Sequence, residues 1–166
     1  PMDPLITDEL YWNLKVCKEV ARLGKINGLN ITFYDPGVRK IIDEKDPKTN
    51  WTNGFYHAMN GGYSLEIHFD AYGEYGYGPG LIPALTLNLN TIDESLARNF
   101  GRYPILFRGG LGSPRRQIRI LEIGKLEGKL EQKLRDKRTS DSTINLISMR
   151  IVNSILEGVG SETISN

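Results

Sequence analysis

The stretch from residue 63 to residue 70 alternates strictly between apolar and polar side chains, and this pattern constrains the fold more than any other part of the sequence. A period of two residues predicts a β-strand with two unlike faces. One face is apolar throughout. The other face consists of four polar residues, Ser64, Glu66, His68 and Asp70. Because the apolar face must be buried against another layer of structure, the chain has to fold around a sheet.

Helical periodicity occurs on both sides of this strand. Helices are predicted from a cap at Thr7 to Gly24, and at 92–100, 126–134 and 144–155, with Gly158 just past the end of the last one. Two more strands are predicted at 29–33 and 118–123, whereas 38–60 is mixed, with a turn at Asp46-Pro47 and no clear element. The repeated alternation predicts an α/β fold, a single domain over 1–166 with a mixed or mostly parallel sheet and helices on both faces.

Composition narrows the functional classes. The chain has 166 residues, 21 Lys+Arg against 20 Asp+Glu and a net charge of +1, which argues against a dedicated polyanion partner. The one cysteine excludes an internal disulfide and a CxxC zinc knuckle. No apolar run approaches the roughly 20 residues that a membrane helix needs. We therefore expect no membrane span.

Two residues stand out as candidates for chemistry. His68 lies near the C-terminal end of its strand, outside which ligand sites of open α/β sheets form. Its imidazole either ligates a metal or moves protons, or is simply held by Glu66 or Asp70 on the same face. Glu122 lies on an otherwise apolar strand, where a carboxylate needs a partner or a task. It is either a general base or the partner of an arginine from the preceding loop.

Other residues are less specific. Glu9 falls in the first turn of a predicted helix, where an acid commonly interacts with the helix dipole. His57 is expected to lie at the surface or behind the site. The tyrosine-rich loop 72–77 can stack on sugar rings or bases, and the arginines of the loop 101–117 can hold phosphates or carboxylates. These arginines are Arg102, Arg108, Arg115 and Arg116.

Three stretches, in order, resemble the zinc-dependent N-acetylmuramoyl-L-alanine amidases (amidase type 3), which cut peptidoglycan. Residues 9–14, ELYWNL, look like the opening of that family's helix after its first strand. Residues 64–71, SLEIHFDA, are similar to its Ser-Ile-His strand motif, and residues 121–127, LEIGKLE, resemble its closing Val-Glu-Ile-Gly strand. The resemblance covers most of the chain in element order, but it is weak over 35–60 and in the two glycine-rich loops.

The resemblance implies an enzyme that hydrolyses the amide between N-acetylmuramic acid and L-alanine, with peptidoglycan or a muropeptide as partner and no nucleic acid. It implies that Glu9 and His68 are zinc ligands. It also implies that Glu122 is the catalytic general base, which takes a proton from zinc-activated water. The family suggests the cell envelope, although the chain itself does not indicate its localisation.

Three further residues have supporting roles in this hypothesis. Glu66 or Asp70 would orient the His68 imidazole through its other ring nitrogen. Arg116 would meet a peptide carboxylate of the substrate. The tyrosine loop at 72–77 would provide a platform for the sugar.

The chain departs from the family at two places. Lys125 replaces the usual aromatic residue after the glycine of the closing strand. The family's first zinc histidine lies on a strand ahead of the helix that bears Glu9, and only 1–6 precede that helix here. We therefore expect an N-terminally incomplete domain that binds zinc weakly or not at all on its own, or else a degenerate site. His57 is the less favoured replacement for the missing ligand.

Two alternatives remain open. The first is a catalytically degenerate amidase-fold module that binds cell-wall peptide or a protein partner. The second is a binder of nucleic acid or phosphate through the arginines of 101–117. The near-zero net charge counts against the second alternative, because phosphate neutralisation dominates such binding.

Overall fold

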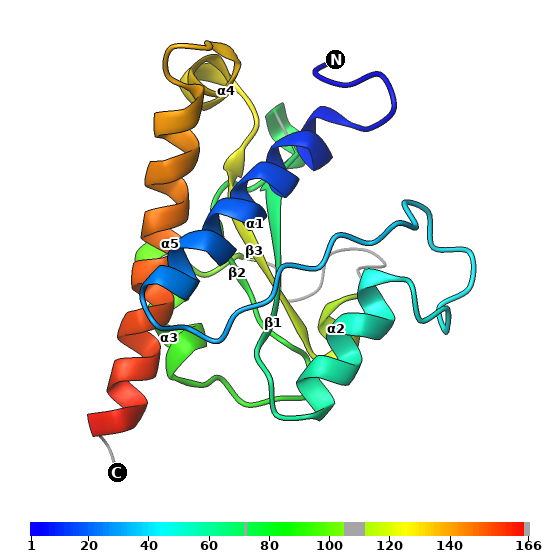
Figure 1. Ribbon diagram of the computed structural model, residues 1–166, viewed down its shortest axis with the longest axis vertical. Coiled ribbons are helices and arrows are strands. Elements are labelled where there is room, and N and C mark those ends of the chain that lie inside the picture. The colour runs from blue at the N-terminus through cyan, green and yellow to red at the C-terminus, as the bar shows by residue number, and fades with distance from the viewer. Residues whose placement is uncertain (72, 105–111, 165–166) are drawn as a thin grey trace.

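The computed structural model describes residues 1–71, 73–104 and 112–164 (Figure 1). The main elements are α1 (Asp8–Ile26), α2 (Asn50–Met59), β1 (Ser64–Asp70), β2 (Gly80–Ile82), α3 (Thr91–Phe100), β3 (Ile118–Lys125), α4 (Gly128–Arg135) and α5 (Ser140–Ile164). Two short 3₁₀ turns, η1 (Gly73–Tyr75) and η2 (Pro114–Arg116), precede β2 and β3. Helices and strands together form an α/β fold, as the alternating pattern predicted.

The sheet of these described residues is small and mixed. Its three strands lie in the order β1-β3-β2, with β1 parallel to β3 and β2 antiparallel to β3. In the parallel pair, His68 lies opposite Glu122, so the two side chains emerge on the same face near the carboxyl ends of their strands. The register becomes irregular between His68 and Asp70.

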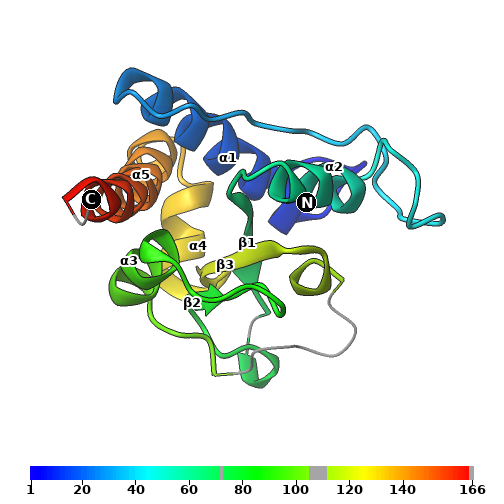
Figure 2. The same cartoon turned by 90° about the horizontal axis from the view of Figure 1, so that it is seen from below.

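One face of the sheet carries the main core. Ile67 of β1 and Leu121 of β3 pack in one buried cluster with Trp12 of α1, Leu96 of α3 and Ile151 of α5. Of these residues, Ile67 and Ile151 lie on the apolar faces that the strand and helix periodicities predicted. The three helices thus cover the apolar face of the sheet, and α3 and α5 lie on the same side of it in Figure 2.

The opposite face is more polar and is partly covered by α2. The hydroxyl of Ser64 on β1 donates to the carbonyl of Gly54 on α2 at 2.6 Å. A Cβ on Gly54 would lie 2.5 Å from the Ile118 side chain, so glycine allows α2 to approach β3. Figure 2 shows α2 and the η2 turn across the sheet from α3 and α5, so helices lie on both faces as predicted.

The strand predicted at 29–33 is not formed, and that prediction was wrong. Residues 29–36 have no regular secondary structure in the described part of the chain. Leu29 and Ile31 instead pack on α1, where their methyl groups lie 3.0–3.5 Å from the position that a Cβ on Gly24 would take. The alternation predicted an apolar face for this segment. That face packs against a helix, and the segment does not pair with a neighbouring strand.

Helical structure also occurs in two places where the sequence did not predict it. The structure forms α2 within the region predicted to be irregular, with Thr49 as its N-cap, accepting a hydrogen bond from the amide of Thr52 at 3.1 Å. Helix α5 continues past Gly158 instead of ending before it. A Cβ on Gly158 would lie 2.6 Å from the Cα of Ile92, so this glycine allows α5 and α3 to pack closely. No helix among the described residues is long and apolar enough to cross a membrane.

Candidate active site at the carboxyl end of the sheet

Glu9 and His68 meet in space although 59 positions separate them in sequence. Thr7 caps α1 by accepting the amide of Leu10 at 3.2 Å, and this cap fixes the first turn that carries Glu9. Glu9 Oε1 lies 3.2 Å from Nδ1 of His68 on β1. The contact that the sequence hypothesis required between these two residues is therefore present.

Glu66 holds the other side of the imidazole. Its Oε2 lies 3.2 Å from Nε2 of His68. The Glu66 carboxylate itself accepts from the Asn50 amide at 2.6 Å and from the Ser113 hydroxyl at 2.8 Å. Asn50 begins α2 and Ser113 precedes η2, so two further elements fix the carboxylate that orients His68.

Glu122 is the buried carboxylate of the site. It is 6% exposed and lies on β3, in register with His68 on the neighbouring parallel strand. Its negative charge acts on the imidazole, where it is one of the interactions that raise the pKa of His68. The polar strand face thus brings Glu122 to the same end of the sheet as the Glu9–His68 contact.

The charges around His68 change its proton affinity. Burial acts to lower the pKa of His68, but hydrogen bonds to Glu66 and Glu9, together with the charges of Glu66 and Glu122, raise it to about 10. Burial acts in the opposite direction on Glu66, yet its hydrogen bonds with His68, Ser113 and Asn50 keep its pKa below the usual value. The imidazole is therefore held as a cation between carboxylates when no metal is bound.

The donor set suits two ligands of a zinc ion. Two donors that lie about 2.0–2.1 Å from a tetrahedral zinc are roughly 3.3–3.4 Å apart. The 3.2 Å between Glu9 Oε1 and His68 Nδ1 is close to that spacing. Glu66 contacts the opposite ring nitrogen, so the three side chains do not converge on one point. Accordingly, the described residues contain no group of three or more His, Cys, Asp or Glu arranged to hold a metal ion.

The remaining candidates lie elsewhere. Asp70 supports the loop that follows β1, since its carboxylate accepts from the amides of Tyr77 at 2.6 Å and Gly78 at 3.0 Å and from the Tyr103 hydroxyl at 2.7 Å. The contact with the His68 ring comes from Glu66, the other carboxylate proposed to orient it. His57 is exposed on α2, and its imidazole lies against Gly62, two residues before β1 begins.

The two loops with candidate binding residues are only partly described. In the arginine loop, Arg116 forms an ion pair with Glu44 at 2.6 Å, and Arg102 forms one with Glu94 at the same distance. Tyr72 and Arg108 lie outside the described residues.

Sequence reasoning missed the residues that support Glu66. Asn50 and Ser113 lie in segments with no helical or strand periodicity, so nothing in the pattern linked them to β1. The one available signal was Thr49, a good N-cap residue that precedes Asn50 and marks the start of α2.

Comparison with known proteins identifies no relative. No protein-family model, no curated protein and no solved structure matches the chain. The function therefore has to be argued from the geometry of the site and from the resemblance of its motifs.

Proposed function

We propose that this chain is the catalytic part of a zinc-dependent amide hydrolase that cleaves the bond between N-acetylmuramic acid and L-alanine in peptidoglycan. The observation that carries the proposal is the contact between Glu9 and His68 at 3.2 Å, beside the buried Glu122. The same three residues occupy the positions that match the motifs of zinc amidases. Helix α1 and the strands β1 and β3 bring them to one end of the sheet.

Each of these residues has a defined task. Glu9 and Nδ1 of His68 would supply two of the three protein ligands that a catalytic zinc normally has. Glu66 would keep the ring oriented by accepting the proton of Nε2. Zinc, when bound, lowers the pKa of a water molecule and polarises the amide carbonyl. Glu122 would accept the proton of the attacking water and deliver it to the departing amine nitrogen.

A binding module without hydrolysis is the second candidate. It is favoured by one specific observation: within the described residues, no third His, Cys, Asp or Glu joins Glu9 and His68 in a group that could hold a metal ion. In that case the same end of the sheet would bind cell-wall peptide without cleaving it. The two candidates predict different results at saturating zinc. The hydrolase should cleave its substrate, because excess metal compensates for the low zinc affinity, whereas the binding module should not.

The deciding experiment measures muropeptide cleavage by this chain at saturating zinc, with Glu122→Gln as the test variant. Glutamine preserves the shape of the side chain but cannot accept the proton. We expect turnover to fall by roughly 10²–10⁴-fold, with zinc content unchanged. His68→Ala should lose zinc and activity together, since it removes a ligand.

Glu127→Gln is the matched control, because Glu127 follows the same strand but is exposed. It should retain the activity of the wild type. A normal rate per folded molecule of Glu122→Gln would overturn the catalytic assignment. Peptide binding without any cleavage at saturating zinc would favour the binding module.

A further inference from the structure

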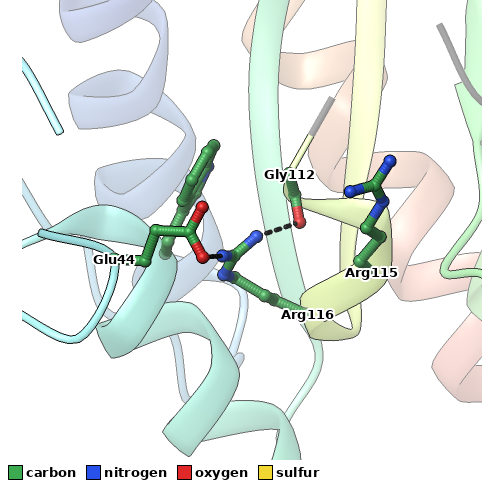
Figure 3. Close-up of a pocket in the computed structure, with 5 residues that line it drawn as sticks. Glu44, Gly112, Arg115 and Arg116 are labelled. Carbon is green, nitrogen blue, oxygen red and sulfur yellow. Dashed lines mark hydrogen bonds and ion pairs between the residues drawn. The ribbon is translucent and has the colours of Figure 1, made fainter. Parts of the chain in front are cut away.

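A polar pocket lies next to the residues that hold Glu66. It has a volume of about 370 Å³ and is lined by Glu44, Trp51, Gly112, Arg115 and Arg116 (Figure 3). Trp51 and Gly112 are the direct neighbours in sequence of Asn50 and Ser113, the two residues that donate to Glu66. The pocket and the candidate active site therefore share the same structural supports.

The Arg116 guanidinium in this pocket is fixed in place. Its central carbon lies 4.1 Å from the centre of the Trp51 ring, and Nη1 donates to the carbonyl of Gly112 at 2.9 Å. Its side chain is 20% exposed. Because stacking and this hydrogen bond already hold the guanidinium plane, little side-chain entropy remains to be lost when an anion binds.

The other side of the guanidinium is occupied by a carboxylate of the chain itself. Nη2 of Arg116 donates to Glu44 Oε2 at 2.6 Å, as Figure 3 shows. Glu44 is 69% exposed and comes from a segment without helix or strand. Since an exposed ion pair contributes little to stability, an external carboxylate can replace Glu44 at small cost.

We propose that this pocket is a substrate subsite that binds the carboxylate of an acidic peptide residue, with Glu44 as the group that the substrate displaces. This inference rests on the proposed function, because it assigns the peptide of the muropeptide to this side of the site. Arg116 recognises the carboxylate, and Trp51 supplies an apolar wall for the adjoining methylene groups. Arg115 adds a second positive charge to the lining.

The position of the pocket supports a substrate role. Asn50 and Ser113 reach Glu66 at 2.6 and 2.8 Å, and Glu66 contacts His68 at 3.2 Å. Asn50 and Ser113, and behind them Glu66, thus connect a peptide held by Arg116 to the imidazole. A ligand seated there would also steady the starts of α2 and η2, the two elements that fix Glu66.

The test compares two muramoyl dipeptides that differ in one group. In one, the second residue carries a free side-chain carboxylate; in the other, that carboxylate is amidated. Binding to the full chain is measured by calorimetry or by NMR shifts, independently of hydrolysis. We expect the acid to bind roughly 3–10-fold more tightly than the amide. Arg116→Gln should abolish this difference, and Glu44→Gln should tighten binding of the acid by removing the competitor.

The controls separate the subsite from the catalytic proposal. Arg22→Gln removes a distant exposed ion pair and should leave the preference unchanged. Arg116→Lys keeps the positive charge but lacks the planar guanidinium, so it should retain only part of the preference for the acid. Equal binding of acid and amide by the wild type, or no binding of either, would overturn the subsite. Preference for the acid without any cleavage at saturating zinc would leave the subsite standing and contradict the proposed hydrolase.

Discussion

His68 has a different neighbour on each ring nitrogen, and this asymmetry determines its chemistry. Nδ1 faces Glu9, on a helix that begins at the end of the sheet, and Nε2 faces Glu66, on the same strand. A metal at Nδ1 would replace one proton, whereas Nε2 would keep its proton and its hydrogen bond with Glu66. Under the proposed function, two carboxylates that lie at equal distances from the ring would therefore have different tasks.

A first prediction concerns the pH dependence of stability in the metal-free chain. The pKa of His68 is raised from 6.5 to about 10 in the folded protein. The folded state consequently binds the proton more tightly than the unfolded state, so the stabilisation is complete below pH 6.5 and is lost as the pH rises towards about 10. Urea unfolding curves measured across this range should show stability falling with pH.

The comparison with His68→Gln isolates this effect from other groups that titrate at high pH. In His68→Gln, the fall in unfolding free energy that the imidazole causes between pH 6.5 and about 10 should be absent. His57→Gln, at an exposed position, should behave as the wild type does. Identical slopes for wild type and His68→Gln would show that the carboxylates do not hold the proton.

At the scale of elements, a buried ion pair joins α3 to β3. Arg119 donates to the Asp93 carboxylate through Nε at 3.0 Å and Nη2 at 3.3 Å, and the two side chains are 4% and 1% exposed. The Tyr63 hydroxyl donates to the same carboxylate at 2.6 Å. Arg119 also lies over the Tyr63 ring, 4.4 Å from its centre. The strand that carries Glu122 is thus anchored to a helix on the far side of the sheet.

The second prediction is that Asp93→Ala costs about 3–5 kcal/mol of unfolding free energy, because it leaves the Arg119 charge buried without its carboxylate. Glu94→Ala in the same helix is the matched control. Glu94 pairs with Arg102 at 2.6 Å, but the two side chains are 45% and 61% exposed. Its loss should cost less than about 1 kcal/mol. Equal costs in denaturant unfolding would contradict the role given to the buried pair.

Local patterns could predict most elements but not their partners. Alternation at 63–70 identified β1 and its polar face, because one face of that strand meets the core. The same alternation at 29–33 did not form a strand, because those residues pack on α1. Gly158 resembles a helix terminator in sequence, but close contact with α3 explains it in the structure. These outcomes depend on tertiary packing, which a local pattern does not contain.

At the scale of the whole molecule, the candidate site depends on long-range contacts. Glu9 and His68 could be proposed from their motifs, and the structure brings them together. Asn50 and Ser113 could not, because each reaches Glu66 from a distant segment of irregular sequence. The residues that do the proposed chemistry were thus visible in sequence, whereas those that position them were not.

A third prediction follows from the overall charge. With a net charge of +1, the chain lacks the excess of cations that phosphate binding needs. One of its candidate arginines, Arg102, also pairs with a carboxylate of the chain. We expect no oligonucleotide binding with a steep salt dependence in a fluorescence titration. Micromolar binding that weakens sharply between about 50 and 200 mM salt would contradict this expectation and revive the nucleic-acid alternative.

The most direct test of the account is a zinc titration of the full chain followed by ¹⁵N NMR of its two imidazoles. We predict weak binding that shifts Nδ1 of His68, leaves Nε2 protonated and does not affect His57. Glu9→Gln should weaken this binding further, whereas Glu127→Gln should not. If millimolar zinc binds at His57 and leaves His68 unchanged, Glu9 and His68 are not half of a zinc site and the proposed hydrolase is wrong.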